Sequence, residues 1–587
     1  MERREFLHML AMAGAAIGVN ACATGKSPLS PDIYAASSFG QARLMHFTDC
    51  HAQLLPVYYR EPNVNLGFGS AYAKPPHLVG DALLQYADIP ANSRFAHAFS
   101  HLDFVDAARR YGKVGGFSHL QTLVKRLRSE VGPGNSLLLD GGDTWQGSGT
   151  ANWTQGEDMV GACNLLGVDA MTGHWEFTYK DTGVAANIEA FGGVFVAQNI
   201  LLKEEALFEG VPAFDEDSGH VFQPYVLREI GGRAIAIIGQ AFPYTPIANP
   251  ARFIPDWTFG IRSSELQQLI NKIKQQHRVD AIVLLSHNGL DVDLKLASVV
   301  SGLDVVLGGH THDGVPLPVV VQNQGGKTLV TNAGSNGKFL AVLDLDFGDN
   351  GIRDYRYRLL PVFSNLLEPD QEMEAYITRV REPWLDQLQE PLGVAEELLY
   401  RRGNFNGTFD QVICDAQRVV GDAQVSLSPG FRWGTTVLPG DTVTMERILD
   451  QTCITYPETY VREMSGEQIK LILEDVCDNL FNPDPFYQQG GDMVRVGGMN
   501  YVCEPQAAAG KRISELTLDD GTAIEASKNY KVAGWGTVNS KAPGPPIWDI
   551  VAEYLKDRKS TRIDRLNTPV LKGVGSNPGL TDYNGSP

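Results

Sequence analysis

The sequence predicts an α/β fold arranged in more than one domain. Continuous apolar runs at 137–139, 281–285 and 305–307 are typical of buried parallel strands. They alternate with amphipathic stretches, such as 118–131 and 264–277, which are typical of helices that cover a sheet. With 587 residues, the chain is long enough for two or three domains.

The elements follow from these patterns in chain order. Expected strands lie at 44–47, 137–140, 168–172, 194–199, 234–239, 281–286, 305–308, 328–332 and 340–347. Expected helices lie at 104–111, 118–131, 156–166, 264–277, 368–388, 411–420 and 466–479. Beyond residue 393 the elements become shorter, which indicates a second domain.

Charge limits the classes of partner. The net charge is −20 and the lysines and arginines are not clustered, which argues against nucleic acid as a partner. An anionic substrate would have to be attracted by a local metal ion or arginine, against the overall field of the protein.

The first 25 residues have the pattern of a Tat-type export signal. Arg3 and Arg4 precede a weakly apolar stretch at 9–19, and the small residues that follow allow cleavage after Ala23. Lipidation of Cys22 is the alternative. The apolar stretch is too short and too rich in Ala and Gly to span a membrane, so we expect a periplasmic protein without a membrane span.

Cysteine usage does not indicate a disulfide scaffold or a zinc ribbon, because no Cys-x-x-Cys pair occurs. One or two disulfides remain open. The six cysteines that follow the signal are Cys50, Cys163, Cys414, Cys453, Cys477 and Cys503.

Metal-ligand residue types follow five separate strands. One such residue alone is more often a hydrogen-bonded loop residue, but the carboxyl ends of parallel strands meet at one edge of a sheet. Imidazoles and carboxylates without a thiolate suit two divalent ions. Asp143 is the natural bridge, because a carboxylate can hold both ions of a two-metal site. The seven candidate ligands are Asp49, His51, Asp143, His174, His287, His310 and His312.

A segment of about sixty residues at 52–113 separates the first strand from the next helix. It is rich in Tyr, Phe, Pro and Asn, and one helix is expected in it. So long a segment in a compact domain is usually functional, as a lid or a docking surface, although a plain insertion remains an alternative.

The predicted organisation has five parts. They are a signal peptide at 1–25, a catalytic domain at 40–365 with an insertion at about 52–113, a linker helix at 366–392, a second domain at 393–572 and an irregular tail at 573–587.

The ordered motifs D-x-H at 49–51, G-G-D at 141–143, G-x-x-E at 173–176, S-H-x-G at 286–289 and G-H-T-H at 309–312 resemble those of calcineurin-like metallophosphoesterases. With its second domain, the chain resembles the 5′-nucleotidase family. The resemblance implies a four-layer α/β sandwich followed by an α/β C-terminal domain. It also implies that Asp143 is shared between two metals. One metal would be held by Asp49, His51, Asp143 and His312, and the other by Asp143, His174, His287 and His310.

In the resembled family, the C-terminal domain supplies arginines to the anionic group of the substrate. The stretch 431–434 occupies the place of that family's G-G-[IV]-R segment, which makes Arg432 the best candidate. A guanidinium suits a tetrahedral oxyanion because its donors form a rigid fork. Arg401 and Arg402 are second candidates, and Tyr501 is a candidate aromatic contact. A solvated surface arginine is the alternative for Arg432.

The chain departs from the family at 173–178. The family sequence G-N-H-E-F-D becomes G-H-W-E-F-T, so the metal-binding Asn is His174, the catalytic His is Trp175 and its Asp partner is Thr178. A general acid assists a poor alkoxide leaving group. Its loss predicts a leaving group that departs without protonation.

These departures, with the stretches 49–54, 59–62 and 145–148, resemble the SoxB subfamily, the sulfate thiohydrolases of bacterial sulfur oxidation. The resemblance implies a manganese pair and the release of sulfate from a cysteine S-thiosulfonate on a carrier protein of SoxYZ type. In that chemistry Arg432 stabilises charge on the sulfonate and Trp175 shapes a narrow site. A segment of the carrier would reach the metals through a channel, with the 52–113 segment as part of its docking surface.

Two alternatives from other classes remain. A periplasmic 5′-nucleotidase or other phosphomonoesterase would use the same metals. A non-catalytic binding protein would explain the loss of the family's His and Asp pair.

Overall fold

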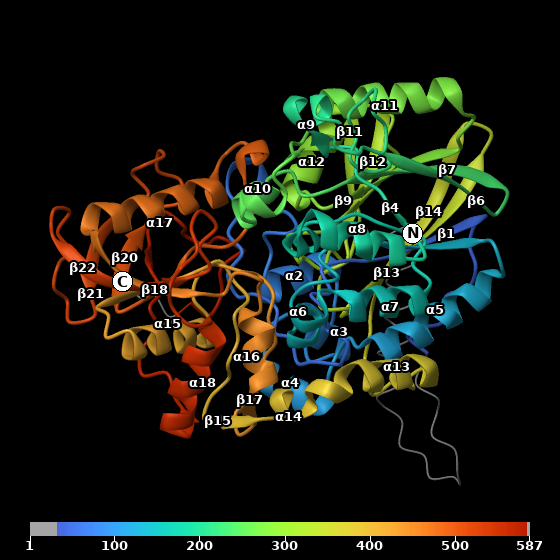
Figure 1. Cartoon of the computed structure of the whole chain (residues 1–587). Coiled ribbons are helices and arrows are strands. Elements are labelled where there is room, and N and C mark those ends of the chain that lie inside the picture. Colours follow the sequence, from blue (N-terminus) through green and yellow to red (C-terminus); the bar gives the residue numbers. More distant parts are fainter. Residues whose placement is uncertain (1–31, 584–587) are drawn as a thin grey trace, which may run out of the picture.

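The computed structural model describes residues 32–583, so the predicted signal peptide lies outside the described residues. Figure 1 shows two bodies side by side, an N-terminal one coloured blue to yellow and a C-terminal one coloured orange to red. No helix among residues 32–583 is long and apolar enough to cross a membrane.

The N-terminal body begins with a six-stranded sheet in the order β14-β13-β1-β2-β3-β4. The strands β1 to β4 run parallel, and β13 joins β1 antiparallel. Their bounds are β1 Ala42–Phe47, β2 Ser136–Asp140, β3 Ala170–Met171, β4 Val194–Phe195, β13 Phe339–Gly348 and β14 Gly351–Pro361.

A second six-stranded sheet has the order β11-β12-β10-β9-β7-β6. Here β7, β9, β10 and β12 are parallel, and the two edge strands are antiparallel. Their bounds are β6 Tyr225–Ile230, β7 Arg233–Gln240, β9 Ala281–Ser286, β10 Val305–Gly308, β11 Val319–Asn323 and β12 Gly326–Asn332. A two-stranded pair, β5 Leu201–Leu202 and β8 Trp257–Thr258, lies outside both sheets.

The two large sheets pack face to face. Buried residues of β1 and β2, such as Leu44 and Leu139, share one core with Ile237 and Val283 of the second sheet. Helices cover the outer faces, so the predicted four-layer sandwich is confirmed. The covering helices are α5 Phe117–Val131, α7 Glu157–Leu166, α8 Lys180–Ala190 and α13 Gln371–Arg381 on the first sheet, with α11 Ser263–Gln276 and α12 Leu290–Val299 on the second. Short helices α6 Gly149–Thr154, α9 Glu204–Phe208 and α10 Thr245–Ala248 complete this body.

The C-terminal body is built on a four-stranded sheet in the order β18-β22-β16-β19. Its strands are β16 Val425–Ser428, β18 Thr459–Ser465, β19 Arg495–Gly497 and β22 Asn529–Trp535, and its helices are α15 Thr408–Val420, α16 Met445–Thr452, α17 Gly466–Phe481 and α18 Ile547–Arg558. This body also has two small sheets of three strands each. The first consists of β17 Thr442–Thr444, β15 Pro391–Ala395 and β23 Ser560–Thr561. The second consists of β21 Ile513–Leu518, β20 Met499–Cys503 and β24 Val570–Leu571.

Two local expectations need correction. The single helix expected at 368–388 ends at Arg381, because Pro383 lacks an N–H and interrupts it before the short α14 Leu385–Leu388. The 52–113 segment holds α2 Gly80–Ala87 and α3 Arg94–Phe99 besides the expected α4 Phe104–Tyr111. The six described cysteines are all free thiols, and the Sγ atoms of Cys477 and Cys503 lie 3.7 Å apart.

The tail from residue 573 to 583 contains no helix or strand, and it packs against the 52–113 segment. Val64 and Leu580 form an isolated β-bridge, and the Asn65 N–H donates to the Gly579 carbonyl. The tail therefore supports the segment that follows the first strand.

Candidate metal centre

All seven predicted ligands lie together at the carboxyl ends of the central strands. The parallel pairings of β1 with β2, β2 with β3 and β9 with β10 place the loops that follow them at one edge. All seven side chains are buried.

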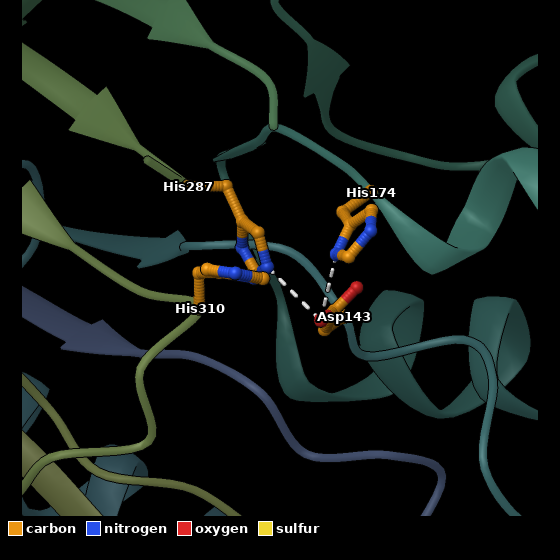
Figure 2. A group of neighbouring side chains, drawn as sticks. All are labelled: Asp143, His174, His287 and His310. Carbon is orange, nitrogen blue, oxygen red and sulfur yellow. Dashed lines mark hydrogen bonds and ion pairs between the residues drawn. The ribbon is translucent and has the colours of Figure 1, made fainter. Parts of the chain in front are cut away.

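The seven ligands form two groups of four, and in each group the ligand atoms lie within 4.8 Å of one another. Asp143 belongs to both groups, and Figure 2 shows it facing the three histidines of the second. The groups are Asp49, His51, Asp143 and His312, and Asp143, His174, His287 and His310.

The backbone at these loops is strained. Asp49, Asp143 and His310 have φ values of 54°, 56° and 73°, in the left-handed region that residues other than glycine rarely adopt. Hydrogen bonds between neighbouring loops hold this conformation. In one of them the Asp49 N–H donates to the Gly142 carbonyl at 2.8 Å. Such strain is characteristic of functional sites and persists where the surroundings enforce it.

Glu176 organises two of the ligand loops. Its buried carboxylate accepts hydrogen bonds from the N–H groups of Thr144 and His174 at 2.8 Å, and of Asp143 and Trp145 at 3.2 Å. Glu176 is the acid of the G-x-x-E motif, for which the sequence alone indicated no role. Its position could have identified it, because Glu176 lies only two residues after the candidate ligand His174.

Neighbouring groups also orient individual ligands. The Thr48 hydroxyl donates to Asp49 Oδ2 at 2.6 Å. His287 Nδ1 lies 2.6 Å from the Gly141 carbonyl, which leaves Nε2 directed at Asp143 Oδ2, 2.9 Å away. Such contacts fix ring orientation and tautomer in metal sites.

The charges of the site are strongly coupled. Burial alone would raise the pKa of Asp143, but the imidazoles of His287 and His174 hold it well below its usual range. Burial would lower the pKa of His287, but the carboxylates of Asp143 and Asp49 raise it to about 10. With a pKa of about 10, the His287 imidazole would be protonated at neutral pH when no metal is bound. A bound divalent ion would replace that proton.

The pKa values of three other histidine ligands shift in the opposite direction. Burial lowers the pKa of His51 to about 4, and it holds the pKa values of His310 and His312 well below the usual range. Neutral imidazole is the form that binds metals, so burial prepares these side chains as ligands.

The ring nitrogens fit a bound cation. His51 Nε2 and His312 Nε2 face each other at 3.1 Å, and His174 Nε2 and both ring nitrogens of His310 have no hydrogen-bond partner among residues 32–583. Buried polar atoms normally have partners. The donor set of imidazoles and carboxylates accepts manganese, zinc or iron, so it does not determine the metal.

A cavity of about 130 Å³ opens over the two groups. Its walls include Trp175, Phe242, Phe431 and Trp433, and the Phe431 and Trp433 rings stack with centroids 4.1 Å apart. Trp175 meets Trp433 edge to face at 5.0 Å. The aromatic walls make the cavity narrow and largely apolar.

Arg432 lines this cavity and also a neighbouring one. Its Nη2 donates to the Gly491 carbonyl at 2.9 Å, and its Nε lies 3.6 Å from Asp492. Arg402 lines only the neighbouring cavity, and its Nη2 donates to the Thr311 carbonyl at 2.7 Å, between two candidate ligands. Both arginines are therefore brought to the site.

Arg401 and Tyr501 do not line either cavity within the described chain. Arg401 pairs with Asp410 at 2.7 Å and donates to the Gln451 and Pro429 carbonyls. Tyr501 is 2% exposed and lies in the hydrophobic core of the C-terminal body. The structure therefore gives no support to a substrate contact for these two side chains, since the arginine has its partners elsewhere and the tyrosine faces the core.

The four-layer sandwich and the two carboxylate and histidine groups at its strand ends define the metal-dependent hydrolases of the 5′-nucleotidase superfamily. Residues 392–547 match the C-terminal domain of 5′-nucleotidases. The chain is 35% identical to the sulfate thiohydrolase SoxB of Thermus thermophilus, with a TM-score of 0.85, covering 92% of this chain and 98% of that one. The chain belongs to the SoxB family within this superfamily.

More distant relatives share the fold. A 5′-nucleotidase precursor, also from Thermus thermophilus, has a TM-score of 0.68 at 20% identity and covers 90% of this chain and 99% of that one. The trifunctional nucleotide phosphoesterase YfkN of Bacillus subtilis is 26% identical over 81% of this chain and 33% of its own length. Rat 5′-nucleotidase is 30% identical over 52% of this chain and 54% of its own. The matches thus span about a third to a half of these curated relatives.

Proposed function

We propose that this protein is a periplasmic, Tat-exported sulfate thiohydrolase that acts on a cysteine S-thiosulfonate carried by a protein of SoxYZ type. Likeness to SoxB over nearly the whole chain supports the proposal. The observation that carries it is the missing general acid. Apart from candidate metal ligands, Arg432 is the one titratable side chain that lines the cavity among the described residues.

The reaction suits a site without an acid. Water adds its oxygen to the sulfonate sulfur, the S–S bond breaks, and its electron pair leaves on the sulfur that remains attached to the carrier cysteine. The products are sulfate, a persulfide anion and two protons. A persulfide anion is stable enough to leave unprotonated, whereas an alkoxide is not.

The residues of this chain have separable roles in that step. The seven ligands would hold two divalent ions, for which we propose manganese and which when bound supply Lewis acidity and an activated water. Arg432 places a guanidinium against the sulfonate oxygens, where its rigid fork of donors stabilises developing charge. Trp175 and Phe431 exclude bulk water and keep the site narrow.

Phosphomonoester hydrolysis is the second candidate, because 5′-nucleotidases are among the relatives of this chain. The cavity size argues against nucleotides. Pockets for drug-sized ligands measure about 300–1,000 Å³, and the cavity here is about 130 Å³. A slender thiosulfonate side chain fits such a volume better than a nucleoside.

The test is a direct comparison of substrates. The metal-loaded protein is expected to release sulfate from a thiosulfonated carrier cysteine and to turn over AMP and nitrophenyl phosphate poorly. Efficient phosphatase activity without sulfate release would contradict the proposal. If neither the wild type nor Arg432→Ala turns over any thiosulfonate, the non-catalytic alternative is favoured.

We also propose that the carrier approaches along the neighbouring cavity. Asn65, Leu66 and His77 of the 52–113 segment line it together with Arg402, and it adjoins the metal groups at His310. Because much of the 52–113 segment is buried against both bodies, its complete deletion would disturb folding. The predicted domain limits remain proposals and can be tested by limited proteolysis.

A further inference from the structure

We propose that Trp433 is a second hydrogen-bond donor to the anionic group of the substrate, beside Arg432. The proposal rests on the proposed function for the identity of that group, a sulfonate. It adds a substrate-contacting residue that the motif comparison with the family did not single out.

The Trp433 indole is held in a fixed position at the cavity. It is 2% exposed and stacks on the candidate ligand His51, with ring centroids 4.9 Å apart and an angle of 26° between the planes. Phe431 stacks on it at 4.1 Å, and Trp175 contacts it edge to face. With these three contacts the indole has little freedom to turn, so its N–H is preorganised.

Two residues that line the cavity carry buried donors without partners. Trp433 Nε1 and Arg432 Nη1 are both buried, and neither has a hydrogen-bond partner among residues 32–583. Both side chains line the cavity over the metal groups. A buried indole N–H normally has a partner, as Trp535 shows in this chain by donating to Ser428 Oγ at 2.8 Å.

An oxyanion would satisfy both donors together. A sulfonate has three oxygens, so it can contact the metal groups and still accept from a guanidinium and an indole N–H. A donor fixed before the substrate arrives requires no reorganisation when charge develops on the sulfonate. The same geometry would disfavour a neutral apolar ligand, which would leave both donors unsatisfied.

The test separates the N–H from the ring. Thiosulfate is titrated calorimetrically into the metal-loaded protein, comparing wild type with Trp433→Phe and with Trp433 replaced by benzothienylalanine, which keeps the bicyclic ring and lacks the N–H. Loss of a hydrogen bond to a charged group is expected to weaken thiosulfate binding about 10- to 100-fold in both variants. Metal content should not change.

Trp535→Phe is the matched control, because it removes an indole N–H that already has a partner away from the cavity. It should bind thiosulfate like the wild type. Equal thiosulfate affinity in wild type and the benzothienylalanine variant would overturn the proposal, even if sulfate release fell. Failure of the wild type to bind thiosulfate would also overturn it. Failure to release sulfate from the carrier, with the affinity difference intact, would count against the proposed function alone.

Discussion

At Asp143, one carboxylate belongs to both ligand groups, and its backbone also accepts the His51 N–H. We expect Asp143→Asn to weaken the binding of both ions, because the amide is neutral and has one oxygen in place of two. Metal analysis of the purified variant should show a metal content well below two ions per chain.

The control for this change is Asp386→Asn, which removes an exposed acid on α14 far from the ligands in sequence. It should retain the metal content of the wild type. An Asp143→Asn protein with a full complement of two ions would contradict the role of this carboxylate as a bridge.

At Trp175, the indole stands where the resembled family has its catalytic histidine, and it forms one wall of the cavity. We expect Trp175→Leu to widen the cavity and so lower the KM for nitrophenyl phosphate, whose leaving group needs no acid. Steady-state kinetics with this ester would measure the change. Trp548→Leu, on α18 and outside the cavity, is the control. An unchanged KM would argue against Trp175 as the limiting wall.

The candidate ligands could be predicted from the sequence because all seven directly follow one of five strands. The hydrogen-bond donors that the C-terminal body contributes to the site could not be predicted in this way. Arg401 and Arg402 are adjacent and identical in type, and only their partners distinguish them, Asp410 for the first and Thr311 for the second. Trp433 could not be identified for the same reason. The lack of a partner for its N–H follows from tertiary contacts, which the local sequence does not determine.

At the scale of elements, the loop between η5 Pro485–Tyr487 and β19 closes over the ligands through two glycines. A Cβ at Gly490 would lie 2.1 Å from His310 Nε2, whereas one at Gly491 would have its nearest neighbour at 3.8 Å. Both glycines have positive φ, 79° and 75°, so backbone strain is similar in the two.

We therefore expect Gly490→Ala to lower the metal content and the rate of sulfate release, because either His310 or the loop must move. Gly491→Ala carries a comparable backbone cost and should retain most of both. Metal analysis and a sulfate assay on the pair would measure the difference. Equal losses in the two variants would assign the effect to backbone strain and not to contact with His310.

Several elements were missed for physical reasons. The edge strands β14 and β6 carry charged residues, so their apolar alternation is weak. The edge strand β11 has only five residues and no buried position. The helices α2 and α3 have only eight and six residues, too few for a clear period. The long runs that form the central strands were predictable because burial on both faces leaves them uniformly apolar.

Across the whole molecule, the 52–113 segment holds the two bodies together. The Thr436 N–H donates to the Tyr58 carbonyl at 2.8 Å, and the Leu66 N–H donates to Asn404 Oδ1 at 2.8 Å. The Thr581 N–H of the tail donates to the Asn63 carbonyl. A segment that the sequence indicated as a lid or docking surface is thus also a structural connection between the bodies.

The attachment of the 52–113 segment to the N-terminal body can be tested at the ion pair between Lys338 and Glu61. Lys338 Nζ lies 2.6 Å from Glu61 Oε1, and the side chains are 1% and 10% exposed. Removing one partner leaves the other charge buried without compensation, so Lys338→Met should lower the free energy of unfolding by about 3–5 kcal/mol, measured by urea denaturation. Lys338→Met combined with Glu61→Gln removes both charges and should recover much of the loss. If the single and double variants were equally destabilised, the cost would lie in packing and not in the unpaired carboxylate.

Because the pair joins the 52–113 segment to the loop after β12, the single variant should also weaken sulfate release from the carrier more than it weakens metal binding.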